Sequence, residues 1–332
     1  MPTRVAIGVC TAHRPDMLGR CLTALAVQAV PPGCHVTVIV VDNQLEPGNR
    51  VAVEAHAGAC LFPIRYLHEP RLGIPYARNA VLDACEGCFD WVAFTDDDRV
   101  PAPDWIAALL AAAERYGADV VYGRREWLPP EGASFWHIPP TKGFAEGQRL
   151  QHAGTHNVLM AGALIALNDN ETLRFDERLT HGEDTDFFYR AATRHGARIV
   201  YSDAPVVYEC VPTHRATLRY HLRQQFYLAA SRSDFQRRHK GLATALTKLA
   251  GRLAFQVPLA AVRLATAPLE WLFGTPRFRR TVVRNAGKLA AAAGALSGTA
   301  GYIGNPYRDT GADGPLAPPP HRAPTLKSGP RS

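Results

Sequence analysis

Three adjacent aspartates, Asp96, Asp97 and Asp98, directly follow the mostly apolar segment WVAFT at residues 91–95. Adjacent carboxylates repel one another, so this arrangement costs stability unless positive charge lies among them. A Mg²⁺ or Mn²⁺ ion would supply that charge, because these ions prefer hard oxygen ligands. A solvated turn without chemistry is the alternative, and the neighbouring segments have to distinguish the two.

A second acidic pair, Glu183 and Asp184, lies in the segment HGEDTDFFYR, which is expected to begin a helix. Acidic residues are favoured at a helix N-terminus for purely structural reasons. A role in chemistry is the other interpretation, so the pair is a second acidic site to be considered beside the triplet.

Apolar runs and helical stretches alternate through the first 125 residues. The expected strands cover residues 4–10, 35–41, 62–67, 90–95 and 118–123, and the expected helices cover residues 15–29, 48–58, 74–86 and 103–116. This alternation predicts an α/β fold with a doubly wound sheet, in which ligands bind beyond the carboxyl ends of the strands. Thr11 and Arg14 follow the first expected strand, Asp42 follows the second, and the three aspartates follow the fourth.

The common nucleotide and hydrolase motifs of such sheets are absent from the sequence. It contains no GxG, and therefore no GxGxxG, and it lacks GxxxxGK[ST], GxSxG and HExxH. These absences argue against a dinucleotide-binding enzyme, a P-loop NTPase, a serine hydrolase and a zinc protease.

Five segments resemble family 2 glycosyltransferases of the GT-A fold, in their order and spacing. They are IGVCTAHRPDMLGRCLTAL, VIVVDN, RLGIPYARNAVLDA, WVAFTDDDRVP and GEDTDFFYR. The resemblance extends to bacterial glucosyltransferases of succinoglycan-type exopolysaccharide assembly, through IGVCT, VDN and YECVPTHR. It covers roughly residues 4–240 and implies a GT-A doubly wound mixed sheet, with a C-terminal helical amphipathic extension outside it.

The resemblance implies a nucleotide-sugar donor, a UDP-sugar, and a Mg²⁺ or Mn²⁺ cofactor that neutralises its diphosphate. It implies that Asp98 coordinates the metal, that Asp96 contacts the ribose or the metal, and that Asp97 lies beside the donor. It also implies contact between Asp42 and the uracil N–H, and places Arg78 close to the diphosphate. A helix cap or Asx turn at Asp42 and a surface salt bridge at Arg78 are the alternatives.

By the same resemblance, Asp184 is the general base, with Glu183 as the alternate, and transfer proceeds by single displacement with inversion. Thr11 and Arg14 would line the exit of the first strand. His214 lies where many GT-A enzymes have a third metal ligand, although a phosphate contact or a structural role is equally open. The segment HLRQQFYLAASR lacks the Q/RxxRW motif of processive synthases. A single hexose addition, with glucose favoured, is therefore expected rather than polymerisation.

Charge divides the chain into an acidic body and a basic C-terminal third. Residues 1–210 carry a net charge of −8, and residues 211–304 carry +13. We expect a GT-A domain at 1–240, a basic amphipathic helical membrane-associating region at 241–304 and a disordered tail at 305–332. Leu242, Leu246, Leu249 and Leu253 recur at helical spacing, which is typical of a helix in the membrane interface plane and also of a helix packed on the protein's own core.

Seven cysteines, an odd and scattered set, favour a reducing cytosol. The enzyme is thus expected to be cytoplasmic and peripheral at the inner face of the plasma membrane, acting on a lipid-linked saccharide acceptor and not on nucleic acid. The alternatives are a sugar nucleotidylyltransferase and a non-enzymatic membrane-surface or nucleic-acid-binding module. VCTAHRPDM lacks the lysine and glycine-rich run that a nucleotidylyltransferase loop would carry.

The irregular segment at 125–157 carries the aromatic residues Trp127, Phe135 and Trp136. Stacking on a sugar or on a lipid-linked acceptor and anchoring of the loop are equally consistent with them.

Overall fold

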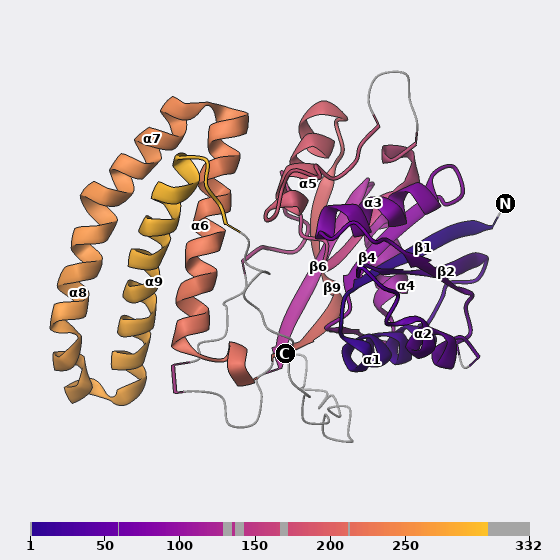
Figure 1. The fold of residues 1–332 in the computed structure, drawn as a ribbon, viewed down its shortest axis with the longest axis horizontal. Coiled ribbons are helices and arrows are strands. Elements are labelled where there is room, and N and C mark those ends of the chain that lie inside the picture. Colours follow the sequence, from indigo (N-terminus) through magenta and orange to yellow (C-terminus); the bar gives the residue numbers. More distant parts are fainter. Residues whose placement is uncertain are drawn as a thin grey trace.

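The computed structural model describes residues 2–58, 60–128, 135–136, 143–166, 172–211 and 213–304. A sheet with helices on both faces forms the body of the protein, and a bundle of long helices lies beside it (Figure 1). The expected tail at 305–332 lies outside the described residues.

The N-terminal part of the sheet is parallel, as the sequence predicts. Its strands are β1 (Thr3–Thr11), β2 (Cys34–Asp42), β3 (Ile64–His68) and β4 (Trp91–Asp96), in the spatial order β3-β2-β1-β4. The chain alternates these strands with α1 (Pro15–Ala26), α2 (Arg50–Ala57), α3 (Ile74–Cys85) and α4 (Trp105–Tyr116). The strand register pairs Thr11 with Asp42 and Cys10 with Asp96. The predicted strand-end residues therefore share one edge of the sheet.

The remaining strands make the sheet mixed. β8 (Asn157–Ala161) is antiparallel to β4, β6 (Val120–Leu128) is antiparallel to β8, and β9 (Ile199–Cys210) runs parallel to β6. The short strands β5 (Arg99–Pro101) and β7 (Arg149–Leu150) both pair with β9 in the antiparallel sense. One continuous strand, β9, covers residues 199–210. The ladder continues across an irregularity at Gly123/Arg124 in β6, where the register shifts.

Two apolar clusters cover the two faces of the sheet. One contains residues of α3 and Phe187 of α5 (Glu183–Arg194), which pack with Phe94 of β4 and with Phe175. The other contains Leu22 of α1 and Trp105 of α4, which pack with strand residues such as Val9 and Val38. Helix α5 thus places its first turn, with Glu183 and Asp184, at the carboxyl edge of the strands.

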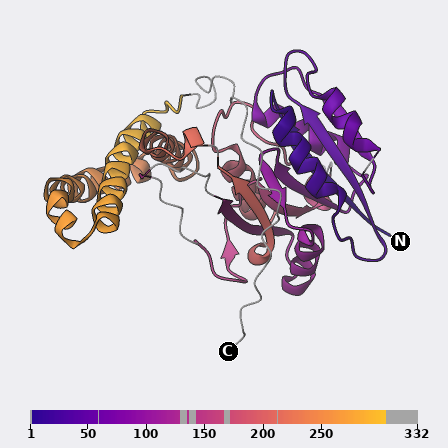
Figure 2. The same cartoon turned by 90° about the horizontal axis from the view of Figure 1, so that it is seen from below.

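The C-terminal bundle consists of α6 (Leu218–Lys240), α7 (Leu242–Gly251), η3 (Arg252–Gln256), α8 (Val257–Glu270), η4 (Trp271–Phe273) and α9 (Thr275–Thr299). Helix α6 lies next to the sheet domain, and α8 forms the outer edge of the molecule (Figures 1 and 2). The predicted boundary at residue 240 falls at the α6–α7 junction, inside the bundle, because α6 packs on α9, and the division into domains stays a prediction. None of the helices in the described part of the chain has the length and hydropathy needed to cross a bilayer.

Glycines bring α6 and α9 into close contact. A Cβ atom added at Gly294 would lie 2.0 Å from the carbonyl oxygen of Phe226, and one added at Gly298 would lie 1.9 Å from that of Ala230. Only glycine fits at such a distance, since real Cβ atoms do not approach backbone oxygens so closely. Small residues therefore determine how tightly the bundle packs.

The leucine stripe predicted in 242–253 has two environments. Leu249 is buried in the bundle, whereas Leu242, Leu246 and Leu253 stay about half exposed. The sequence alternatives of a core-packed and a surface helix therefore both apply to α7, each to part of the stripe.

Candidate active site

The aspartate triplet lies at the end of β4, and each of its members has a different environment. Asp97 is buried, and its Oδ2 accepts a hydrogen bond of 2.8 Å from the Thr11 hydroxyl. The Arg14 guanidinium lies 3.4 Å from Asp97 Oδ1. Asp96 is the most open of the three, with 35% of its side chain exposed. The predicted residues of β1 and β4 are thus brought together around Asp97.

Arginines supply the positive charge that the triplet needs. Arg99 donates to Asp98 Oδ1 at 2.7 Å and lies 3.7 Å from Asp96 Oδ2. Arg215 donates to Asp98 Oδ2 at 3.2 Å. Arg99 also forms an ion pair of 3.0 Å with the buried Glu209 on β9. The repulsion inferred from the sequence is therefore offset within the protein itself.

Burial and the neighbouring charges give Asp97 and Asp98 different pKa values. Burial and the neighbouring charge of Asp98 raise the pKa of Asp97 to about 7. For Asp98, burial acts to raise the pKa, but the charges of Arg99 and Arg215 outweigh it and lower the pKa below its ordinary value. Asp98 is thus held as a carboxylate.

Arg78 connects the two acidic sites. It donates a hydrogen bond to Glu183 Oε1, and its Nη2 lies 3.8 Å from Asp96 Oδ1. All three residues come from different elements, namely α3, β4 and α5. Both Arg78 and Glu183 are buried, so their charges compensate each other away from water. The predicted diphosphate-binding arginine therefore lies between the triplet and the expected base.

The two carboxylate oxygens of Asp184 have different neighbours. Its Oδ1 accepts a hydrogen bond of 2.6 Å from the Thr185 amide. Its Oδ2 lies 3.5 Å from the position that a Cβ atom of Gly154 would occupy, and the His156 ring lies 2.8 Å from the same position. Burial and the charge of Glu183 raise the pKa of Asp184 to about 6. A carboxylate of this acidity is charged at neutral pH and still accepts a proton readily.

Asp42 is surrounded by its own loop. Gln44, Asn49, Gly48 and Tyr66 donate five hydrogen bonds to its carboxylate, at distances of 2.6–3.0 Å. Burial acts to raise the pKa of Asp42, but the hydrogen bonds from Asn49 and Tyr66 outweigh it and lower the pKa. Asp42 thus orders the loop after β2, and its contact with the uracil ring of a donor stays a prediction.

The carboxylates of Asp96 and Asp98 have the oxygen chemistry that a divalent cation takes. Within the described ranges, no three His, Cys, Asp or Glu side chains are grouped so as to hold a metal. Mg²⁺ is usually held by one or two carboxylates together with substrate phosphates, and two carboxylates are present here. Both oxygens of Asp98 accept hydrogen bonds from arginines, whereas Asp96 is the more open of the two. His214 lies in η2 (Thr213–Arg215), and its side chain lies outside the described part.

Sequence reasoning missed several residues of this site. Arg99 directly follows the triplet in DDDRV, so its proximity was visible, although its direction was not. Arg215 lies 117 positions from Asp98, and no local signal predicts that pair. Tyr122 forms a hydrogen bond of 3.0 Å with His156, and these residues are 34 positions apart, so no local signal predicts that pair either.

The aromatic residues of the irregular segment reach the bundle. The Trp136 ring lies 6.1 Å from that of Phe278 on α9, and the Phe135 carbonyl accepts a hydrogen bond of 3.1 Å from Arg279. Trp127, on β6, is contacted by the Arg125 guanidinium at 4.7 Å from its ring centre. These contacts anchor the described part of the loop, whereas stacking on a ligand stays a prediction.

The comparisons with known proteins agree with this geometry. The family model described as "Glycosyl transferase family 2" matches residues 6–173. The succinoglycan biosynthesis protein ExoM of Rhizobium meliloti (strain 1021) is 35% identical to this chain over 231 residues, which cover 67% of this chain and 72% of that protein.

Solved structures share the fold at low identity. The mannosyltransferase PcManGT from Pyrobaculum calidifontis, in complex with GDP-Man and Mn²⁺, gives a TM-score of 0.59 at 19% identity and covers 90% of this chain and 87% of its own. TarS 1-349 of S. aureus, in complex with UDP, gives 0.50 at 17% identity and covers 90% and 92%. The matched family and the 35% identical relative show that this chain belongs to the family 2 glycosyltransferases, and its fold is the GT-A fold.

Proposed function

We propose that this chain is an inverting glycosyltransferase that moves a single hexose, glucose in the first instance, from a UDP-sugar to a lipid-linked oligosaccharide or polysaccharide precursor. The observation that carries this proposal is the position of Arg78, which contacts Asp96 at the donor edge and Glu183 beside the expected base. The similarity to a protein of succinoglycan biosynthesis supports an exopolysaccharide precursor as the acceptor.

The residues divide the chemistry between two ends of the site. Asp184 accepts the proton of the acceptor hydroxyl as this oxygen attacks the anomeric carbon, and the bond to the diphosphate breaks on the opposite face. Attack by the acceptor oxygen from the side opposite the leaving diphosphate inverts the configuration, so an α-linked donor gives a β-linked product. Arg78 forms an ion pair with Glu183, and the adjacent Asp184, whose pKa is raised to about 6 by burial and by the charge of Glu183, is the proposed proton acceptor.

At the other end, Asp96, Asp97 and Arg14 face the donor diphosphate and ribose, and Thr11 fixes Asp97 by its hydrogen bond. A Mg²⁺ or Mn²⁺ ion held by Asp96 and Asp98 would neutralise charge on the departing diphosphate. Asp42 contacts the uracil ring of the donor from the loop that this aspartate orders. His214 remains in this proposal as a further metal or phosphate contact.

A lipid-linked acceptor lies in a membrane, so the enzyme has to work at a membrane surface. We assign the protein to the cytoplasmic side of the plasma membrane, as a peripheral protein. The net charge of +13 in residues 211–304 supports this assignment, since the inner leaflet carries anionic lipids.

The test is a panel of UDP-sugars with Mg²⁺ or Mn²⁺, in which release of UDP is measured with and without a lipid-linked acceptor. The native chain is expected to use one hexose donor, and Asp184→Asn is expected to lower turnover by about 10²–10⁴-fold. Glu183→Gln is the matched variant, because it alters the adjacent carboxylate and should change donor affinity more than the pH profile. Turnover of Asp184→Asn equal to that of the native chain would refute the proposed base.

A further inference from the structure

Helix α8 buries small side chains and exposes large apolar ones, which is the reverse of an ordinary surface helix. Its buried residues are Ala260 and Ala267, seven positions apart. The large apolar residues instead repeat at intervals of three, four and seven along its exposed side. We call them the outer stripe, which consists of Phe255, Leu259, Val262, Leu269 and Phe273. In water, a helix gains stability by burying such side chains and exposing the small ones.

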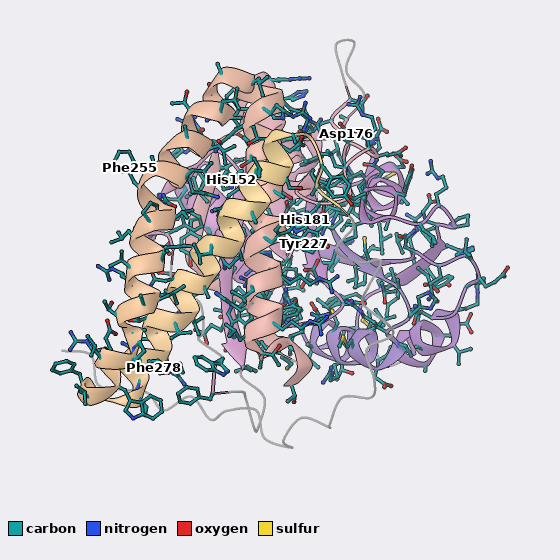
Figure 3. The ribbon with its side chains drawn as sticks, turned by 60° about the vertical axis from the view of Figure 1, so that its left-hand side comes forward. His152, Asp176, His181, Tyr227, Phe255 and Phe278 are labelled. Carbon is teal, nitrogen blue, oxygen red and sulfur yellow. The ribbon has the colours of Figure 1, made fainter. Side chains whose placement is uncertain are left out.

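The C-terminal end of the stripe is strongly exposed. Leu272 is 80% exposed and Phe273 is 71% exposed, and Trp271 lies beside them in η4. At the other end, Phe255 is 76% exposed and is directed outward from the edge of the bundle (Figure 3). A contiguous apolar surface of this kind marks an interaction site rather than scattered surface residues.

The polar groups near the stripe are arranged for an apolar surrounding. The Thr266 hydroxyl, which lies within the stripe, donates to the Val262 carbonyl at 3.1 Å. Glu270 accepts a hydrogen bond of 2.6 Å from Thr281 on α9, so its charge is held towards the bundle. The exposed Arg277 guanidinium lies 5.7 Å from the centre of the Phe273 ring. A long cationic side chain of this kind can reach lipid headgroups while its ring partner is in the acyl region.

Charge identifies the partner. Residues 211–304 contain 15 Lys and Arg residues and two acidic ones. The acidic residues are both engaged internally, Glu270 with Thr281 and Asp234 with Arg237 and Arg238. The exposed charges of the bundle that remain are therefore cationic, which complements an anionic surface.

We propose that the outer stripe and η4 dock in the plane of an anionic lipid bilayer. At 1.5 Å per residue, the 14 residues of α8 extend about 21 Å, less than the roughly 30 Å hydrocarbon core. The helix therefore lies along the interface rather than across it, and the aromatic tip at 271–273 enters most deeply. The docking surface itself is argued independently of the proposed function. Its purpose, which is to bring the active site to a lipid-linked acceptor, rests on that function.

The experiment measures sedimentation of the purified full chain with phosphatidylglycerol/phosphatidylcholine vesicles and with pure phosphatidylcholine vesicles. The native chain is expected to bind the mixed vesicles, and raised salt is expected to weaken this binding. Phe255→Ser/Leu259→Ser should lower the partition coefficient about 100-fold, because each lost apolar side chain accounts for roughly tenfold. The Trp fluorescence of the native chain should shift to the blue with mixed vesicles, and Trp271→Phe should remove most of that shift.

The matched control is Val51→Ser/Leu61→Ser. These side chains are 78% and 79% exposed but belong to the sheet domain, so this variant should bind vesicles as the native chain does. Absence of binding by the native chain, or equal binding by the stripe variant, would overturn the proposal. A native dimer that the stripe variant converts to monomers, without vesicle binding, would assign the stripe to a second copy instead. Donor hydrolysis is measured separately with soluble UDP-sugar, so its loss would count against the proposed function and not against the membrane surface.

Discussion

Asp186 links helix α5 to the bundle, and its neutralisation gives the sharpest prediction. Its side chain is 3% exposed and accepts hydrogen bonds from Arg190 at 2.8 Å, from Arg238 at 2.9 Å and from His239 at 2.7 Å. Arg190 belongs to α5, whereas Arg238 and His239 belong to the last turn of α6. A carboxylate only accepts, so the His239 Nε2 must donate. Asp186→Asn keeps the shape and removes the charge that these three groups share.

The expected loss follows from the burial of the pair. Removing one partner of a buried ion pair typically costs about 3–5 kcal/mol, because the other partner is left without compensation. We expect the free energy of unfolding to fall by about 3–5 kcal/mol in Asp186→Asn, within the total of roughly 5–15 kcal/mol of a typical domain. Because Asp186 lies two residues after Asp184, turnover should also fall, by about tenfold, while KM for the donor changes little.

Asp234→Asn is the matched control. Asp234 is equally buried and shares Arg238, at 2.7 Å, but its other partner, Arg237, also belongs to α6. This variant should lose stability and keep its turnover at temperatures where it is folded. Denaturant unfolding and steady-state kinetics of both variants separate the two roles. An equal loss of turnover in the two variants would mean that Asp186 serves stability alone.

The pH dependence gives an independent check. Burial acts to raise the pKa of Asp186, but the hydrogen bonds from His239 and Arg190 outweigh it and lower the pKa below 3.8. A lowered pKa in the folded state contributes stability that is present above the unfolded value and lost as the pH falls through the folded value. The stability difference between the native chain and Asp186→Asn should therefore be constant near neutral pH and shrink below about pH 4. A difference that is unchanged at about pH 3 would refute the electrostatic explanation.

Three further predictions test the rest of the structure. The turnover of the native chain should rise with pH through about 6, because Asp184 acts only when deprotonated, and Asp184→Asn should abolish this limb of the pH–rate profile. In Gly154→Ala the new Cβ would lie 2.8 Å from the His156 ring, so steady-state kinetics should show about tenfold lower kcat, whereas unchanged kcat would mean that the ring moves freely. In Gly298→Ala the new Cβ would lie 1.9 Å from the Ala230 carbonyl oxygen, and thermal unfolding should show a loss of about 1–3 kcal/mol or more; an unaltered melting temperature would show that α6 and α9 can separate without cost.

The residues at the edge of the sheet were predictable because the apolar pattern of a strand and the residue that ends it are both local features of the sequence. Apolar strands followed by polar residues place Thr11, Asp42 and Asp96 at carboxyl ends, and parallel pairing brings those ends together. The charge compensation was not predictable in the same way. Arg78, Arg99 and Arg215 come from a helix, a strand and a turn, and only the tertiary fold decides which carboxylate each of them meets.

The C-terminal third shows where periodicity fails for a different reason. The spacing of Leu242, Leu246, Leu249 and Leu253 is the same for a helix that faces protein and for one that faces lipid, because both surroundings are apolar. The structure divides them, with Leu249 inside and the others outside. The outer stripe has the same heptad spacing. Only the burial of Ala260 and Ala267 on the other side of α8 shows that the stripe faces outward.

Helix α6 couples these two parts of the molecule. Its last turn holds Asp186, and its Ser231 hydroxyl lies 2.9 Å from His181 Nδ1, just before the ED pair. His181 and Tyr227 meet where the bundle joins the sheet domain (Figure 3), with ring centres 6.4 Å apart. A neighbouring side of α6 packs on α9, where Gly294 and Gly298 leave no space for a Cβ atom. If the bundle docks on a bilayer and the acceptor is lipid-linked, as proposed, α6 would connect the bilayer surface to the first turn of α5, which carries Asp184.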